Sequence, residues 1–162
     1  MRSWPTVVVL GALLAGCGGK SAADYQKEAR AALDGGDFAT AIGRVEEALG
    51  QETVRNDPAA AWRLEQIRLE ALAKAGKGGE VKTGLERLAS AYPNQVNASL
   101  YRSLADRVKT AGDTTGAIEI LTGGDQRFPA EHASFVEAIQ AIKSAGGIDP
   151  AQVEKLKALG YL

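Results

Sequence analysis

The stretch from Tyr25 to Leu49, YQKEARAALDGGDFATAIGRVEEAL, decides the fold. Apolar or small residues recur in it at helical spacings of three and four, at Tyr25, Ala29, Ala32 and Leu33, then at Phe38, Ala41, Ile42, Val45, Ala48 and Leu49. Gly35-Gly36-Asp37 separates the two stripes, and the Asp37 carboxylate can cap the second helix by accepting from its free backbone N–H groups. The stretch therefore predicts two helices joined by a tight turn.

This hairpin resembles a tetratricopeptide repeat. The family pattern has an aromatic and a small residue in the first helix, a Gly-Asp-aromatic turn, and then Ala, a large apolar residue and Ala. Those places are taken by Tyr25, Ala29, Gly36, Asp37, Phe38, Ala41, Val45 and Ala48. The small residues would let the two helix backbones approach closely, while the large ones fill the gaps beside them. The resemblance implies a stack of such hairpins that binds another protein.

A second match begins after Asn97. Its first stripe is Tyr101, Leu104, Ala105 and Val108, its turn is Ala111-Gly112-Asp113, and its second stripe is Ala117, Ile118 and Leu121. Gly123-Gly124 lies where the second helix should finish, so we expect this helix to end early, near Thr122.

Between these two matches lies a more divergent unit. Its first helix should start at Asp57-Pro58, because Pro is tolerated in the first turn, and should run to about Ala75. The following turn, GKGG at residues 76–79, is too long for the strict family pattern. The return helix should stop at Tyr92-Pro93. The spacing between the repeats is longer than the family period, and the linker over residues 50–56 contains most of the additional residues.

The predicted fold class is all-α: a short, right-handed, TPR-like α-solenoid of about three helix hairpins over residues 22–128. Residues 129–162 read as two further helices, divided by Gly146-Gly147 and restarted at Asp149-Pro150. Terminal units of a solenoid must cover the exposed end of its core, so we interpret these helices as a C-terminal cap.

The chain starts with the parts of a secretory signal. Arg2 supplies a positive charge, and an apolar run of about ten residues follows from Thr6 to Ala15, too short to span a bilayer. Leu14-Ala15-Gly16-Cys17 resembles the lipobox of bacterial lipoproteins. That resemblance implies removal of residues 1–16 as a signal peptide and acylation of Cys17. The alternative is an ordinary signal peptide in which Cys17 falls near the cleavage site by chance.

The resemblance also predicts where the protein resides. Two or more acyl chains give stable membrane anchoring, and residues 17–21 would form a short flexible tether. In that family an Asp directly after the cysteine tends to retain the protein in the inner membrane, whereas this chain has Gly18. We therefore expect a lipid-anchored cell-envelope protein, on the outer membrane facing the periplasm if the organism has two membranes.

The composition limits other functions. A net charge of −1 gives no electrostatic case for nucleic-acid binding. One histidine, His132, and one cysteine exclude multi-histidine metal sites and intramolecular disulfides. His132 is interpreted as a surface or partly buried residue, and the GKGG stretch lacks the strand and spacing of a phosphate-binding loop. We expect no enzyme activity, no cofactor and no metal.

In tetratricopeptide proteins the first helix of each hairpin lines a binding groove. By that correspondence the groove residues are Gln26, Arg30, Arg63, Gln66, Glu70, Lys74, Arg102, Asp106 and Lys109. Basic residues outnumber acidic ones among them, which favours an acidic or C-terminal peptide of an envelope protein as partner. The alternative is that they are simply solvated polar faces. The predicted function is a protein–protein interaction scaffold or assembly factor; the rival is an envelope ligand-binding protein for a peptidoglycan fragment or small metabolite.

Overall fold

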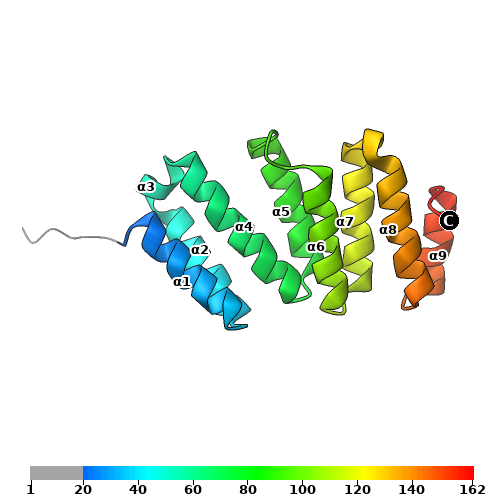
Figure 1. Cartoon of the computed structure of the whole chain (residues 1–162), viewed down its shortest axis with the longest axis horizontal. Helices are drawn as coiled ribbons and strands as arrows, with labels where there is room; N and C mark the ends of the chain where they lie inside the picture. Colours follow the sequence, from blue (N-terminus) through cyan, green and yellow to red (C-terminus); the bar gives the residue numbers. More distant parts are fainter. Residues whose placement is uncertain (1–19) are drawn as a thin grey trace, which may run out of the picture.

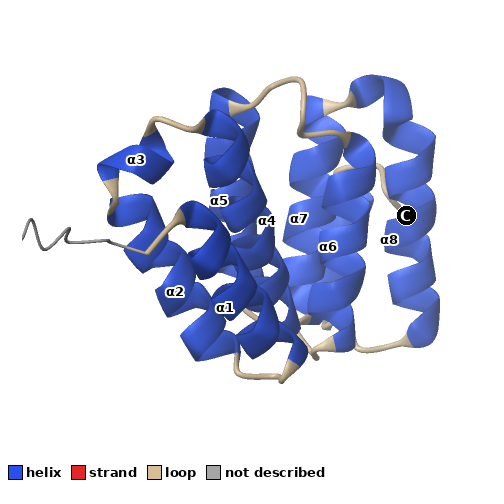
Figure 2. Ribbon diagram, turned by 60° about the vertical axis from the view of Figure 1, so that its left-hand side comes forward, coloured by secondary structure: helices blue, strands red, loops and turns tan. Residues whose placement is uncertain are grey.

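The computed structural model describes residues 20–162, and within this range every regular element is a helix. Figure 1 shows the helices following one another along the long axis, from α1 at one end to α9 and the C-terminus at the other. The same helices, joined by loops at their ends, are seen from another side in Figure 2. The predicted all-α fold is confirmed.

Three helix hairpins make up most of the fold. They are α1 (Ala22–Asp34) with α2 (Phe38–Gly50), α4 (Pro58–Lys74) with α5 (Gly78–Ala91), and α6 (Ala98–Thr110) with α7 (Thr114–Arg127). A one-turn helix, α3 (Glu52–Arg55), occupies the linker between the first two hairpins. After a 3-10 turn at Pro129–Glu131, the chain ends with α8 (His132–Ala145) and α9 (Pro150–Ala158).

The three hairpin turns have the same length. Each leaves three residues between its helices, and the central residue is a glycine with positive φ: Gly36 at +80°, Gly76 at +68° and Gly112 at +98°. The expectation of a longer turn at residues 76–79 was therefore wrong. Gly78 already belongs to α5, because its backbone N–H is capped by Asp113 from the next hairpin rather than by a residue of its own turn.

The expectation that the helix after Thr114 ends near Thr122 was also wrong. Helix α7 continues through Gly123-Gly124 to Arg127. A Cβ atom on Gly124 would lie 2.6 Å from Cε1 of Phe135 and 3.0 Å from Cβ of Tyr101. The missing side chain thus makes room for Phe135 of α8, and packing outweighs the weak helix propensity of glycine.

The buried apolar residues form two clusters that share α4. Leu64, Ile67 and Ala71 join the side chains of α1, α2 and α3, whereas the other side of α4 belongs to a larger cluster that continues to α9. The residues of α4 in that larger cluster are Leu69, Leu72 and Ala73. Helices α8 and α9 were expected as a cap, and they bury Phe135, Ile139 and Leu156 against the larger cluster.

Among residues 20–162, the search for a membrane-crossing helix finds none that is both long enough and apolar enough.

Candidate functional site

The first helices of the three hairpins lie side by side, with α4 between α1 and α6. Polar side chains from all three meet over α4 at a surface that we call the α1–α4–α6 face, defined by Arg30, Gln66, Glu70, Lys74, Ser103 and Arg107. Because these helices come from successive hairpins, their stacking brings together residues almost 80 positions apart in the chain, from Arg30 to Arg107.

Glu70 is the centre of this face. Its Oε2 accepts a hydrogen bond from Nη1 of Arg30 at 2.9 Å, and its Oε1 accepts one from Nη1 of Arg107. Nζ of Lys74, one turn further along α4, lies 3.6 Å from the same carboxylate. One carboxylate therefore links cations from α1, α4 and α6.

The surroundings of Glu70 lower its pKa. Partial burial acts to raise the pKa of this carboxyl, but the hydrogen bond from Arg30 and the charges of Arg107 and Arg30 outweigh burial and hold it below its ordinary value. The side chain of Glu70 is 20% exposed, against 45% for Arg30 and 43% for Arg107. The carboxylate is thus enclosed, while the arginines that pair with it remain open to solvent.

Two open hollows flank this ion-pair cluster. One of about 170 Å³ lies between α4 and α6 and is lined by Gln66, Leu69, Glu70, Leu100, Ser103, Leu104 and Arg107. The other, of about 420 Å³, is lined by Phe38, Lys74, Asp106, Arg107, Thr110 and Ala111. Arg107 lines both hollows, so its side chain lies at the boundary between them.

The predicted groove residues divide into two groups. Arg30, Gln66, Glu70 and Lys74 lie on the α1–α4–α6 face. The three predicted residues of α6 line a different hollow of about 130 Å³, together with Ala138 and Ala141 of α8; they are Arg102, Asp106 and Lys109. Arg102 there hydrogen-bonds Ser134, lies 3.5 Å from Glu131 and stands 5.8 Å from the centre of the Phe135 ring. Asp106 also lines the larger hollow beside Arg107.

Three predicted site residues stand apart from these groups. Gln26 is half-buried on α1, one turn before Arg30, and Arg63 is exposed on α4 before Gln66. Cys17, the predicted lipidation site, lies outside the residues that the structure describes.

Arg107 was missed in the groove prediction. Correspondence with the groove positions of tetratricopeptide proteins predicted Arg102, Asp106 and Lys109, and Arg107 lies between these positions in the sequence. A signal for it existed, because Arg107 follows Ser103 by one turn and shares a side of α6 with Leu100 and Leu104.

Other charged clusters support the packing of helices. Between α4 and α5, Glu65 is 4% exposed and its Oε1 lies 2.7 Å from Nη2 of Arg87. At the C-terminal end, buried Asp125 accepts a hydrogen bond from the Tyr161 hydroxyl at 2.7 Å, and Nδ1 of the exposed His132 lies 2.9 Å from the same carboxylate. No group of three His, Cys, Asp or Glu side chains suited to a metal ion is found within residues 20–162.

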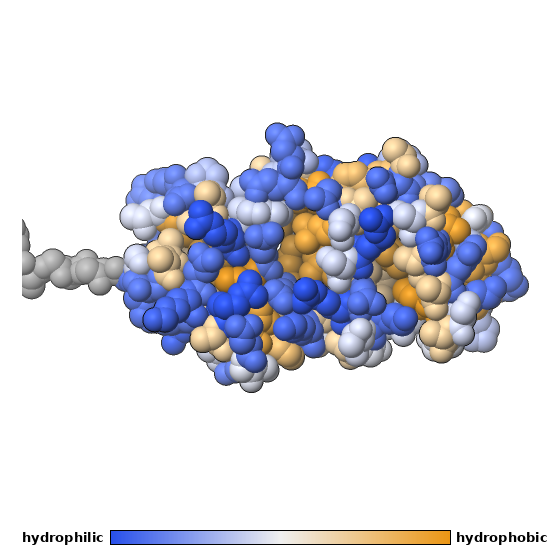
Figure 3. Space-filling view, in the orientation of Figure 1, coloured by the Kyte–Doolittle hydropathy of each residue, from blue (hydrophilic) through white to orange (hydrophobic). Residues whose placement is uncertain are grey.

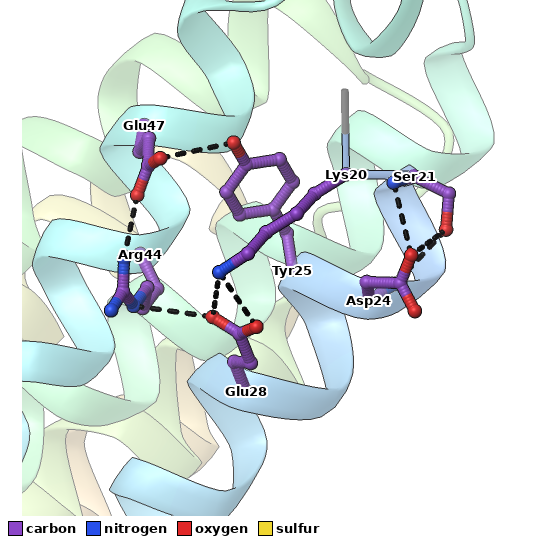
Figure 4. A network of polar contacts seen from close by, with 7 residues as sticks. All are labelled: Lys20, Ser21, Asp24, Tyr25, Glu28, Arg44 and Glu47. Atoms are coloured by element: carbon purple, nitrogen blue, oxygen red, sulfur yellow. Dashed lines mark hydrogen bonds and ion pairs between the residues drawn. The ribbon is translucent and has the colours of Figure 1, made fainter. Parts of the chain in front are cut away.

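A polar network holds the start of the described chain on the first hairpin (Figure 4). Lys20 contacts Glu28 at 2.7–2.8 Å and stands over the Tyr25 ring, while Arg44 pairs with Glu28 and Glu47. The Tyr25 hydroxyl donates to Glu47 at 3.0 Å. The last residues of the expected tether are therefore attached to α1 and α2.

The face of the molecule seen in Figure 3 is mostly polar. In the view of Figure 3, hydrophilic side chains cover most of the face, and hydrophobic ones come to the surface mainly in the recesses between helices. Among the described residues, the large apolar side chain of Leu159 is strongly exposed, at 53%.

Comparison of the chain with models of protein families, with curated proteins and with solved structures finds no match in any of the three.

Proposed function

We propose that this chain is a lipid-anchored cell-envelope protein that acts as a tetratricopeptide-like scaffold, binding a segment of a partner protein on the α1–α4–α6 face. The observation that carries the proposal is the meeting of Arg30, Glu70 and Arg107, from three successive hairpins, over one surface with hollows on both sides. Open hollows of this kind suit an extended polypeptide better than a small molecule, which needs an enclosing pocket.

The proposed anchor gives this surface a position. Lys20 follows Cys17 by three residues, which can span at most about 11 Å even when fully extended. Since Lys20 is itself held to Glu28, lipid on Cys17 would keep the first hairpin next to the membrane. The function proposed is thus to present a binding surface at a set short distance from a lipid bilayer.

The anchor is tested by replacing its cysteine. Cys17→Ser should release the protein from the membrane fraction, and globomycin should make an uncleaved precursor of the wild type accumulate. If the variant stays with the membrane and the drug changes nothing, the lipoprotein proposal is wrong.

The binding surface is tested by crosslinking in membranes followed by mass spectrometry. The double variant Arg30→Glu with Arg107→Glu should lose the partner that the wild type captures. The matched control, Lys143→Glu with Lys157→Glu, makes the same charge change at exposed positions on α8 and α9, which contribute no residue to the face, and should retain it. A separate pair, Arg102→Glu with Lys109→Glu, tests the hollow between α6 and α8. A partner retained by Arg30→Glu with Arg107→Glu would contradict binding on the α1–α4–α6 face, and retention in both pairs would contradict binding in either place.

A further inference from the structure

The ion pair between Glu70 and Arg107 lies between the two hollows of the α1–α4–α6 face. Arg107 lines both the smaller hollow, of about 170 Å³, and the larger one, of about 420 Å³. Its guanidinium group extends from α6 to Glu70 of α4. The pair therefore lies where a bound segment would have to pass.

The charges around Glu70 are unequal. Three cations, Arg30, Lys74 and Arg107, share this one carboxylate, which leaves an excess positive charge of two on the cluster. Both arginines are more than two-fifths exposed, so their remaining N–H donors face solvent. The planar guanidinium group can bind a carboxylate through a bidentate pair of hydrogen bonds.

The hollows on either side offer apolar contact. Leu69, Leu100 and Leu104 line the smaller one, and Phe38 and Ala111 line the larger one. Their volumes, about 170 and 420 Å³, are of the size of one or a few side chains. A ligand that filled both would place apolar groups on each side of the cationic cluster.

We infer that Glu70 is an internal substitute for an acidic side chain of the partner, and that the partner segment carries an Asp or Glu between apolar residues. This inference rests on the proposed function and specifies its ligand. On binding, the incoming carboxylate takes the place of Glu70 at Arg107 and Arg30, and the flanking apolar side chains enter the two hollows. Glu70 keeps the arginines paired until then, at a cost to the affinity of the partner.

A basic segment fits this surface poorly. It would meet Glu70 and Asp106, but it would also face Arg30, Lys74 and Arg107, and like charges brought together on a partly desolvated surface oppose binding. A free inorganic anion could pair with the arginines, yet it would leave both hollows unfilled. The acidic segment with apolar neighbours satisfies the charge and the hollows together.

The test is a selection of random nine-residue peptides, displayed on phage, against the full-length chain held in nanodiscs. The wild type should enrich peptides with an Asp or Glu flanked by apolar residues. A fluorescein-labelled synthetic copy of the best peptide should bind Glu70→Gln about three- to tenfold more tightly, because the competing charge is gone. It should bind Arg30→Gln with Arg107→Gln about tenfold or more weakly, and Lys143→Gln with Lys157→Gln unchanged.

The outcomes separate failure of the inferred acidic ligand from failure of the proposed binding surface. Enriched peptides without an acidic residue, or weaker binding by Glu70→Gln, overturn the inference and leave the scaffold proposal in place. Failure of both the wild type and Glu70→Gln to enrich any peptide overturns the inference and the proposed groove together. Arg107→Lys keeps the charge and serves as a second variant: it should weaken binding less than Arg107→Gln, and equal losses would contradict the role assigned to charge.

Discussion

The carboxylate of Asp113 caps a helix of the neighbouring hairpin through Gly78. Its Oδ2 accepts a hydrogen bond from the backbone N–H of Gly78 at 2.9 Å, while its Oδ1 accepts one from Gly116 at 2.7 Å. One side chain thus caps the start of α5 and the start of α7, two helix ends at which a negative charge is also favourable. The two backbones approach so closely there that a Cβ on Gly78 would lie 2.5 Å from Cα of Gly116.

This shared cap predicts an unusually large effect of Asp113→Ala. Loss of one cap costs about 1 kcal/mol, so loss of two should lower the free energy of unfolding by about 2–3 kcal/mol in urea titrations. The control is Asp37→Ala, at the equivalent turn of the first hairpin, whose carboxylate caps α2 alone through Thr40. Equal losses in the two variants would show that the bond to Gly78 contributes nothing.

The adjacent glycines of α7 should respond in opposite ways to alanine. Gly123→Ala adds a methyl group whose nearest neighbour is Cε of Lys82 at 4.0 Å, and it should stabilise the helix by about 0.5–1 kcal/mol. Gly124→Ala places its methyl against Phe135 and should destabilise the fold by about 1–3 kcal/mol. Thermal unfolding followed by circular dichroism measures both, and a stabilised Gly124→Ala protein would contradict the packing described.

Tyr161 should make stability depend on pH in alkaline solution. Burial, followed by the hydrogen bond to Asp125 and the charge of that residue, raises the pKa of Tyr161 from 10 to about 12. A group whose pKa is raised by folding stabilises the folded state below its unfolded pKa and loses this effect as pH rises through the folded one. The contribution of Tyr161 should therefore be complete below pH 10 and disappear between pH 10 and about 12.

The variant Tyr161→Phe isolates this contribution. It removes the hydroxyl that donates to Asp125 and should cost about 1–3 kcal/mol at neutral pH, because Asp125 is 8% exposed and loses a donor. The difference in unfolding free energy between wild type and variant should shrink as pH rises above 10. A difference that stays constant to pH 12 would refute the role given to this hydrogen bond.

Ser21 should stabilise the first turn of α1. Its hydroxyl accepts from the backbone N–H of Asp24, and the Asp24 carboxylate accepts in return from the backbone N–H of Ser21. Ser21→Ala should cost about 1 kcal/mol and speed amide hydrogen exchange at the start of α1. Ser90→Ala is the control, since its exposed hydroxyl donates only to Glu86 within α5, and it should leave the exchange at α1 unchanged.

Much of the fold could be predicted from spacing and turn residues. The stripes of the first and third hairpins, the start of α4 after Asp57 and the stop of α5 before Pro93 are local signals, and the structure confirms them. The two errors have non-local causes. Gly78 starts a helix because Asp113, 35 residues away, caps it, and Gly124 stays helical because Phe135 needs its space. A pattern of neighbouring residues in the sequence predicts neither the cap on Gly78 nor the packing against Gly124.

The site was predicted less completely. Arg30, Glu70 and Lys74 were assigned to one face and do meet. The spacing of Arg107 from Ser103 and Leu104 could have placed it on the same side of α6, but its pairing with Glu70 depends on the packing of two hairpins, which no local pattern shows. The assignment of Arg102, Asp106 and Lys109 to the same surface assumed that each first helix presents one row of side chains. The structure gives α6 two rows, one toward α4 and one toward α8, because it is flanked by a helix on each side.

The sharing of α4 by two apolar clusters has a mechanical consequence. Tension applied at the N-terminal end, where a lipid would hold the chain, acts first on the cluster formed by α1 to α3 and the Leu64–Ala71 side of α4. The larger cluster takes its buried residues from Leu69 of α4 onward, and Ile42 of the first hairpin packs against it as a partly buried neighbour. Under tension the protein should thus unfold in two steps. The membrane-proximal first hairpin should unfold and extend first, and the rest of the helices should unfold afterwards.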